Sequence, residues 1–423
     1  MKTFRLNHRV TFFSYNSNYA KADANDLSGN VVTINVTKEY ERGAGRWQIN
    51  FTFQPDKKTG KRLDEILAPN DMCLIELDAG DGRGLVPVMR GLVDRVARTV
   101  SINGDGAPQH RVKVSGSDMG KILLKHDIGW DISVVHGDLS VVGGKVAVRT
   151  IRTDAMVISG TPGEVVQSIF NKYVVGGTAF DLDPVIAKWL NLEIDGADNW
   201  LMKNSEILTE VGSAWEVMMR YANIPINVLY TETDNNGDFY VYHEKRPLDS
   251  NGDIAAETPV NIIDDRLIVY EDIGVSDEDR VNYFFYKVPL LTVQSEQNRI
   301  PFFATAEGGK DTLIYSDDPE IRRNGLSQHS ADTIYIPIGQ ENLNQECGTR
   351  AKAIWEWYRY NHTLLNGTYV VHGMPEISVG EALLHAETRG KFLIEGYSHA
   401  YSVHPVPSFT TTIECTRGKV QKR

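Results

Sequence analysis

The stretch from Gly367 to Gly418 constrains the fold most, because it predicts four short β-strands in immediate succession. Apolar and polar residues alternate in part along each strand, and turn residues separate them. The predicted strands are Thr368–Val371, Glu381–His385, Lys391–Ser398 and Phe409–Cys415. A meander of this kind needs other strands to cover its edges. We expect residues 265–293 to supply them, with Thr410–Cys415 in the same barrel as the predicted strand 280–288.

Period-two alternation also assigns faces within this meander. In the third strand Phe392 and Ile394 share one face, and Lys391, Leu393 and Glu395 share the other. In the last strand the residues predicted to share a face are Phe409, Thr411, Ile413 and Cys415. The turn Thr388-Arg389-Gly390 is predicted to close a hairpin before the third strand.

Residues 1–115 predict a second β region without a convincing helix. Its predicted strands are Val31–Thr37, Trp47–Phe53, Met72–Leu77, Pro87–Val96 and Arg111–Gly116. In the second of these every other residue is a large apolar one, which is typical of a half-buried strand. Asn103-Gly104-Asp105-Gly106 predicts a hairpin turn. The near-regular spacing favours a sandwich or barrel, and the two β regions are interpreted as diverged copies of one module.

The chain between the two β regions predicts an α+β domain. A short helix over Ser117–Leu124, capped by Ser117 or Asp118, is followed by a helix that a capping box starts at Thr161 and Glu164. The strongest helical periodicity runs from Ser205 to Ala222 and stops at Asn223-Ile224-Pro225. A hairpin of Ile226–Thr231 and Phe239–His243 comes next.

The order of these elements gives the domain boundaries. Residues 294–345 are polar and loop-rich, and Gln345–Asn361 has helical periodicity. We therefore expect an α+β, mainly β fold with a first β-barrel at 1–117, an α+β middle domain at 118–264, and a second barrel. This second barrel combines 265–293 with 367–418, and 294–366 is a loop and helix insertion within it.

Composition excludes several classes of protein. The 423 residues suffice for two to four domains, and no apolar run is long enough to span a membrane. The N-terminus has no apolar segment typical of a signal peptide. Cys73, Cys347 and Cys415 lie far apart and are expected to be reduced, buried thiols. The net charge of −12 argues against extensive phosphate contacts with nucleic acid and would suit an acidic channel that lets DNA pass.

Motifs for catalysis or metal binding are not found. The histidines His372, His385, His399 and His404 have no recognised ligand spacing and are interpreted as structural. Asp234, Asn236 and Asp238 match the start of an EF-hand loop, but Phe239 replaces its glycine and Lys245 its last ligand, so a hairpin turn is favoured.

The remaining candidates are weaker still. The acidic pairs Asp264-Asp265 and Asp317-Asp318 lie in turn-like sequence, and neither is singled out as a glycosidase dyad. The aromatic run Trp355–Tyr360 could stack on sugar but is more typical of a helix with one buried face and one docked face. The basic tail Arg417–Arg423 is expected to be solvated or to dock on a partner. We expect no catalytic, cofactor-binding or metal-binding residues and no enzyme activity.

An ordered series of weak motifs resembles the central baseplate hub proteins of phage tails and contractile injection systems. This family includes the late-control hub and the N-terminal part of the VgrG spike. The motifs are Gly91-Leu92-Val93-Asp94, Val114–Lys121, Ser213–Met218 with Ala222–Pro225, His243–Pro247, Asp317–Ile321 with Asn324-Gly325, Ile377–Gly380, Gly390–Glu395, Ser398-His399 and Thr410–Gly418. They occur in the family's order along nearly the whole chain.

The resemblance implies a structural protein of the virion tail baseplate that assembles in the bacterial host cytoplasm. It implies a homotrimer whose six tube-like barrels join the hexameric tail tube protein to a trimeric spike. Because only five residues follow Gly418, the spike is expected to be a separate protein. Other baseplate proteins and the tape measure C-terminus are further expected partners, and DNA would pass through the lumen during host cell entry. The alternative from another class is a carbohydrate-binding or carbohydrate-active β protein, such as a cell-wall hydrolase.

Overall fold

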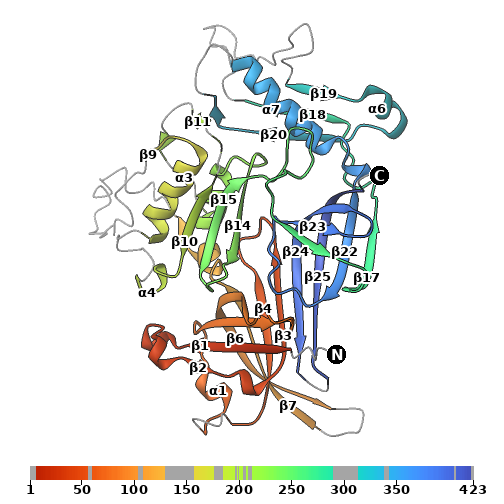
Figure 1. The fold of residues 1–423 in the computed structure, drawn as a ribbon. Helices are drawn as coiled ribbons and strands as arrows, with labels where there is room; N and C mark the ends of the chain where they lie inside the picture. Colours follow the sequence, from red (N-terminus) through yellow and green to blue (C-terminus); the bar gives the residue numbers. More distant parts are fainter. Residues whose placement is uncertain are drawn as a thin grey trace, which may run out of the picture.

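One large sheet of 13 strands joins the N-terminal and C-terminal parts of the protein (Figure 1). The computed structural model describes residues 6–55, 60–102, 108–128, 157–175, 184–195, 198, 200–202, 206–207, 212–288, 313–337, 343–403 and 406–420. The main path of the sheet is β17 (Ile268–Gly274), β22 (Leu365–His372), β25 (Ser408–Val420), β24 (Gly390–Ser402), β3 (Val31–Glu39), β4 (Arg46–Thr52), β7 (Pro108–Asp118), β6 (Val86–Ile102), β5 (Met72–Asp78), β1 (Asn7–Phe13) and β2 (Asn25–Asp26). The predicted fold class, α+β with β-structure predominant, is confirmed.

The N-terminal half of the sheet encloses a hydrophobic core, to which Tyr401 and Phe409 of the C-terminal half also contribute. All five strands predicted from residues 1–115 are present as β3 to β7, and the alternating residues Trp47, Ile49 and Phe51 are buried as expected. Strand β1, which pairs with β5, was not predicted. The predicted turn 103–106 lies outside the described residues, although β6 and β7 pair as a hairpin on either side of it. A short helix, α1 (Leu63–Ile66), lies beside β6.

The C-terminal half contains the four predicted strands as β22, β23 (Ala382–His385), β24 and β25. Phe392 and Ile394 are buried in the same core cluster as Ile413 and Cys415, as their predicted faces require, whereas Phe409 belongs to the core cluster of the N-terminal half. Strand β17 pairs with β22, so part of the segment 265–293 does cover the meander. On the other side β16 (Val260–Ile263) pairs with β23 in a parallel manner. The two predicted barrels are thus two halves of a single sheet, because β24 also pairs with β3.

The predicted place of strand 280–288 is wrong. Strand β18 (Tyr283–Lys287) lies in a separate sheet between β19 (Ile314–Ser316) and β20 (Gln328–Asp332), whereas β25 pairs with β22 and β24. Its Phe284 and Tyr286 are buried in the core under helix α7 (Leu343–Tyr358) rather than in the C-terminal half of the sheet. Apolar residues on both faces indicate that a strand is covered, but they do not indicate by what.

The middle of the chain forms helices around a three-stranded sheet of β10 (Asn191–Asp195), β15 (Phe239–Lys245) and β14 (Asn227–Thr233). The predicted hairpin is β14 and β15, and β10 adds to it in parallel. Helix α3 (Pro162–Ile169) has the predicted capping box of Thr161 and Glu164, and it continues into a π-helical segment, η6 (Phe170–Val175). The remaining short helix here is α4 (Pro184–Ala187).

Two helix predictions are corrected. The helix predicted from Ser205 is only α5 (Ala214–Tyr221), because Ser213 and Glu216 form a capping box that starts it there. The preceding residues form β12 (Glu206–Ile207), paired with β9 (Val157–Ile158), and β13 (Gly212–Ser213), paired with β8 (Asp127–Ile128). The helix predicted over Ser117–Leu124 is α2 (Lys121–Lys125), and neither Ser117 nor Asp118 is its N-cap.

The segment after β17 packs against the middle domain. Helix α7 confirms the periodicity predicted for Gln345–Asn361, and Trp355 and Ile354 share one core cluster with Trp215 and Met218 of α5. Smaller elements here are α6 (Asp318–Asn324) and β21 (Tyr335–Ile336), which pairs with β11 (Leu201–Met202). Among the described helices, none has the length and apolar character needed to cross a membrane.

Candidate functional site

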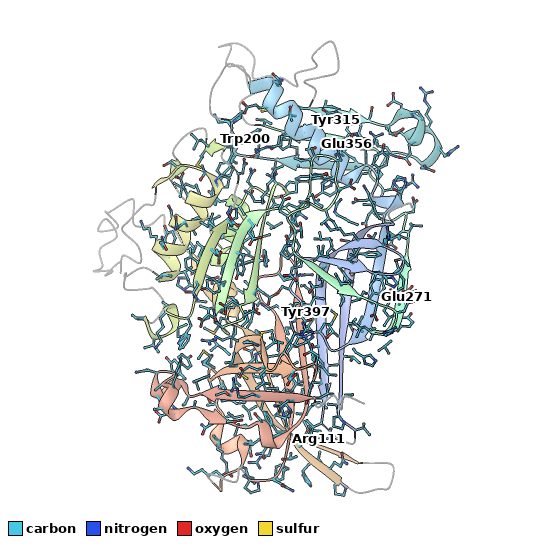
Figure 2. All side chains as sticks on the ribbon, in the orientation of Figure 1. Arg111, Trp200, Glu271, Tyr315, Glu356 and Tyr397 are labelled. Carbon is cyan, nitrogen blue, oxygen red and sulfur yellow. The ribbon has the colours of Figure 1, made fainter. Side chains whose placement is uncertain are left out.

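A buried ionic cluster lies where the two halves of the sheet meet. Lys38 of β3 and Tyr397 of β24 are direct partners in the pairing that joins the halves. The Lys38 ammonium donates hydrogen bonds to Asp118 Oδ2 at 2.5 Å and to the Thr231 carbonyl oxygen at 2.9 Å. Its side chain is 1% exposed and that of Asp118 0%. The cluster therefore links both halves of the sheet to strand β14 of the middle domain (Figure 2, where Tyr397 is labelled).

Glu232 is the second carboxylate of this cluster. It lies 4.0 Å from the Lys38 ammonium and accepts a hydrogen bond of 3.1 Å from the Tyr397 hydroxyl. Burial raises the pKa of the Glu232 carboxyl, and the positive charge of Lys38 opposes this only in part. Burial also raises the pKa of Tyr397 well above its usual value. The cluster is enclosed by protein, so its arrangement suits a structural junction better than a reaction with a solute.

The clearest exposed surface lies on β16 and β17. Strand β17 is one end of the sheet path, and Figure 2 labels its Glu271 on the outer edge of the molecule. Of the large apolar side chains that are exposed in the described residues, five fall between residues 260 and 275: Val260, Ile262, Val269, Tyr270 and Val275. Tyr270 is 56% exposed and Ile262 is 62% exposed. A sheet end that exposes apolar side chains is typical of a protein-binding surface.

The structure separates the four histidines that the sequence grouped together. His372 is exposed, His385 and His399 are buried, and His404 lies outside the described residues. His399 is enclosed between Tyr397 and Phe409, and its Nδ1 lies 3.0 Å from the Thr411 hydroxyl. Burial lowers the pKa of His399 to about 3. Its neighbours thus agree with the structural interpretation.

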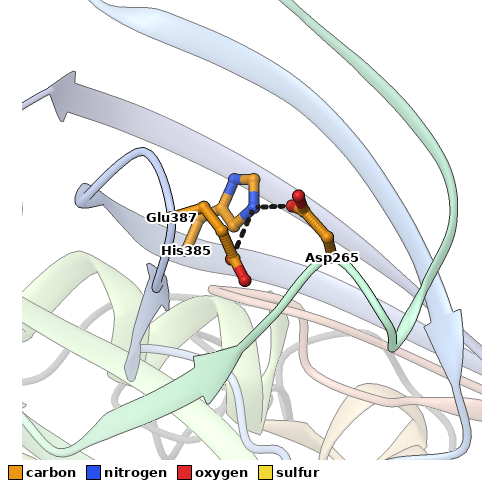
Figure 3. Close-up of side chains that lie close together, drawn as sticks. All are labelled: Asp265, His385 and Glu387. Carbon is orange, nitrogen blue, oxygen red and sulfur yellow. Dashed lines mark hydrogen bonds and ion pairs between the residues drawn. The ribbon is translucent and has the colours of Figure 1, made fainter.

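His385 differs from the others because two carboxylates face it (Figure 3). Its Nε2 lies 2.8 Å from Asp265 Oδ1 and 3.4 Å from Glu387 Oε2. In the described part of the chain these three residues are the one group of histidine, cysteine and acidic side chains that could hold a metal ion. Asp265 belongs to a pair that the sequence placed in a turn, while Glu387 was not singled out.

The other acidic candidates have structural roles. Asp317 caps helix α6 by accepting a hydrogen bond from the backbone of Glu320. Asp234 accepts hydrogen bonds from the backbone nitrogens of Asn236 and Asp238, which agrees with the hairpin turn favoured over a calcium loop.

The two indoles of the aromatic run are not exposed for stacking, although Tyr360 is 44% exposed. Trp355 and Trp357 are both 4% exposed, and the Arg359 guanidinium lies over the rings of Trp355 and Tyr360. A cleft of about 490 Å³ between α7 and the middle domain also includes Trp200, but the guanidinium of Arg350 covers that indole at 3.3 Å. The same guanidinium forms two hydrogen bonds of 2.6 Å with Asp198, which tie α7 to the middle domain.

The beginning of the basic tail is not free. Residues 417–420 belong to β25, and the Arg417 side chain donates a hydrogen bond to the Trp357 carbonyl oxygen. The prediction of a solvated or docking end is therefore wrong for Arg417, whereas the Lys419 side chain is 48% exposed, and residues 421–423 lie outside the described part. All three cysteines are free and buried, as predicted.

Comparison with known proteins identifies the fold. No family model matches the sequence, and no curated protein does. Among solved structures, the 43 kDa tail protein of prophage MuSo2 from Shewanella oneidensis aligns over 97% of this chain and 98% of its own, with 12% identity and a TM-score of 0.54. The tail protein from Neisseria meningitidis MC58 aligns over 97% and 96%, with 12% identity and a TM-score of 0.52.

A likeness to the Francisella PdpA-VgrG complex, with a TM-score of 0.48 and 9% identity over 97% of this chain and 52% of that one, is too weak to support an argument. The two tail proteins are similar to this chain from end to end, so the match includes the middle domain and not the sheet alone. The resemblance to phage tail proteins expected from the sequence is confirmed for the fold. This chain has the fold of these two tail proteins.

Proposed function

We propose that the chain is the structural baseplate hub of a phage tail or of a phage-tail-like injection particle. In this role three copies form a ring that joins the hexameric tail tube to a separate trimeric spike. The observation that carries the proposal is the end-to-end similarity to two tail proteins, one of them from a prophage. The domain division expected from the sequence, with β18 moved from the second barrel to the insertion, is part of this proposal.

The organisation of the sheet supports a ring of copies. Each copy contributes two sheet halves with separate cores, so three copies would present six similar units to a sixfold tube. A closed ring requires two different complementary surfaces on each copy. The exposed end of the sheet at β17, with Val269 and Tyr270 beside it, is the surface we assign to one side of this contact. Other baseplate proteins and the tape measure C-terminus are further proposed partners.

The test is a cryo-electron microscopy map of the distal end of the intact particle, purified from the bacteria that produce it. We expect three copies of this chain between tube and spike, with β16 and β17 of each copy covered by its neighbour. The variant Val269→Lys should reduce incorporation into particles, because it places a charge in that contact. Leu326→Lys is the matched control, since Leu326 is 63% exposed but lies beyond α6, far along the chain from the sheet.

Two results would count against the hub. One is a particle map in which this chain lies elsewhere or is not threefold. The other is a monomer of the purified chain that releases sugar from bacterial cell wall, which would favour the carbohydrate-active alternative. The buried indoles of Trp355 and Trp357 give that alternative little support, and we propose no enzymatic activity and no cofactor.

A further inference from the structure

Two carboxylates from separate turns approach one imidazole nitrogen in the C-terminal half of the sheet (Figure 3). Asp265 lies in the turn between β16 and β17. His385 is the last residue of β23, and Glu387 lies in the hairpin that follows. The candidate ligand atoms of the three residues all lie within 4.8 Å of one another. Residues separated by 120 positions in sequence are therefore brought to one point.

Backbone hydrogen bonds fix both turns. The Asp264 side chain accepts a hydrogen bond of 2.9 Å from the Arg266 nitrogen, which holds the first turn. The nitrogen of Ala386 donates to the Ile263 oxygen at 2.8 Å, and that of Arg389 donates to the His385 oxygen at 2.8 Å. The Tyr369 ring packs against the imidazole in a T-shaped arrangement, with ring centroids 5.9 Å apart. Because these contacts set the backbone and the imidazole ring, ordering on binding is confined to the two carboxylate side chains.

The donor set suits a divalent transition ion. The imidazole side chain is 5% exposed, whereas Asp265 and Glu387 are 69% and 45% exposed, so the nitrogen is fixed and the carboxylates can adjust. Two ligands on a tetrahedral zinc ion at its usual bond lengths are about 3.3 Å apart. The observed separations of 2.8 Å and 3.4 Å from the nitrogen are close to that value. Imidazole combined with carboxylates favours zinc or manganese over calcium.

We propose that Asp265, His385 and Glu387 bind a divalent transition metal ion, with water completing its coordination. Two carboxylates and a neutral imidazole would balance the charge of such an ion. The ion would connect the turn between β16 and β17 to the hairpin between β23 and β24. In the described residues β16 and β17 have different partners, β23 and β22, and do not pair with each other. The ion would thus hold together the two strands that carry the exposed apolar surface. This proposal does not depend on the proposed function.

The test uses the full-length chain purified without a histidine tag and treated with chelator. Binding of Zn²⁺ is measured by calorimetry, and binding of Co²⁺ is measured by its visible absorption, which reports the coordination. The variants Asp265→Asn and Glu387→Gln change exposed side chains, so folding should be retained and is checked by circular dichroism. His362→Asn is the control, because His362 faces a single carboxylate, that of Glu320, at 3.4 Å.

We expect one Zn²⁺ per chain, a higher melting temperature with Zn²⁺, and a loss of affinity of about tenfold or more in each carboxylate variant. The control should bind like the wild type. Failure of the wild type to bind Zn²⁺ or Mn²⁺ would overturn the proposal and leave His385 in a hydrogen bond with Asp265. Binding that is unchanged in both carboxylate variants would overturn it as well, because the ion would then lie elsewhere.

Discussion

Replacement of Lys38 by methionine tests whether the buried cluster holds the two halves of the sheet together. Removal of one partner from a buried ion pair costs about 3–5 kcal/mol, because the other charge stays buried. Asp118 would keep three donors, namely the Gly45 and Gly120 nitrogens at 2.9 Å and the Thr231 hydroxyl at 3.3 Å. We therefore expect a loss near the lower end of that range, about 3 kcal/mol, in the free energy of unfolding.

The assay is urea unfolding of the full-length chain at pH 7, followed by circular dichroism in the β-sheet region. Lys419→Met is the matched control. Lys419 pairs with Asp253 on the surface, where the side chains are 48% and 49% exposed, so its loss should cost less than about 1 kcal/mol. Hydrogen exchange would locate the effect, since β3 and β24 should lose protection together.

The double variant Lys38→Met with Asp118→Asn separates charge from packing. A neutral amide in place of the carboxylate removes the uncompensated buried charge, so the double variant should recover part of the stability lost in Lys38→Met. The reasoning would be refuted if Lys38→Met cost no more than the surface control. The reasoning would also fail if the loss of unfolding free energy in the double variant equalled the sum of the losses in the two single variants.

Two further changes test the packing of each half of the sheet. His399 has a folded pKa of about 3 against an ordinary 6.5, so the unfolded state binds more protons between these values. The free energy of unfolding should therefore fall by up to about 1.4 kcal/mol per pH unit as the pH drops below 6.5. His399→Leu should flatten this dependence in acid unfolding curves. The same slope of stability against pH in the variant and the wild type would contradict this expectation. In the N-terminal half, a Cβ at Gly116 would lie 2.1 Å from the Leu92 oxygen and 2.4 Å from the Trp47 ring. Gly116→Ala should lower stability by about 1–3 kcal/mol in thermal unfolding, whereas Gly29→Ala, with open space around it, should not. Equal melting temperatures of the two variants would refute this.

Strands were predictable where one face is buried and the other is exposed to solvent. In β4 and β25 the alternation of apolar and polar residues identified both the strand and its faces. Pairing between distant strands was less accessible. Strand β18 has aromatic residues on both faces and follows β17 in sequence, yet it pairs with β19 and β20. Periodicity reports that a strand is covered, and the choice of partner depends on tertiary packing.

The helix predicted from Ser205 failed for a related reason. Its apolar spacing suited a helix, but Glu206 and Ile207 pair with β9, and Gly212 has a φ of 152°, which does not continue a helix. The capping box of Ser213 and Glu216 was the better indicator of the start. Local hydrogen-bonding signals therefore outperformed the apolar pattern at this position.

The candidate sites could be predicted only in part. Lys38 follows Ile34 and Val36 at intervals of two residues, so period-two alternation would have placed it on the same, buried face of β3. A lysine at that position would have indicated a buried charge. Its partners Asp118 and Glu232 come from other parts of the chain, and no spacing reveals them. The same holds for Asp265 and His385, which were noticed separately and meet only because β16 pairs with β23.

The pairing of β24 with β3 also limits where another protein can extend the sheet. That pairing covers one edge of each half of the sheet. The main path then ends at β17 and β2, and the branch through β23 ends at β16. Strand β2 has two residues, and short edge strands offer few hydrogen-bonding groups. Strand β17 has seven residues and carries exposed Val269 and Tyr270. Pairing of β17 with β17 of a second copy would be an isologous contact and would give a twofold dimer. The proposed hub requires instead that β17 contact a different surface on its neighbour, because heterologous contacts of that kind generate rings when their rotation closes.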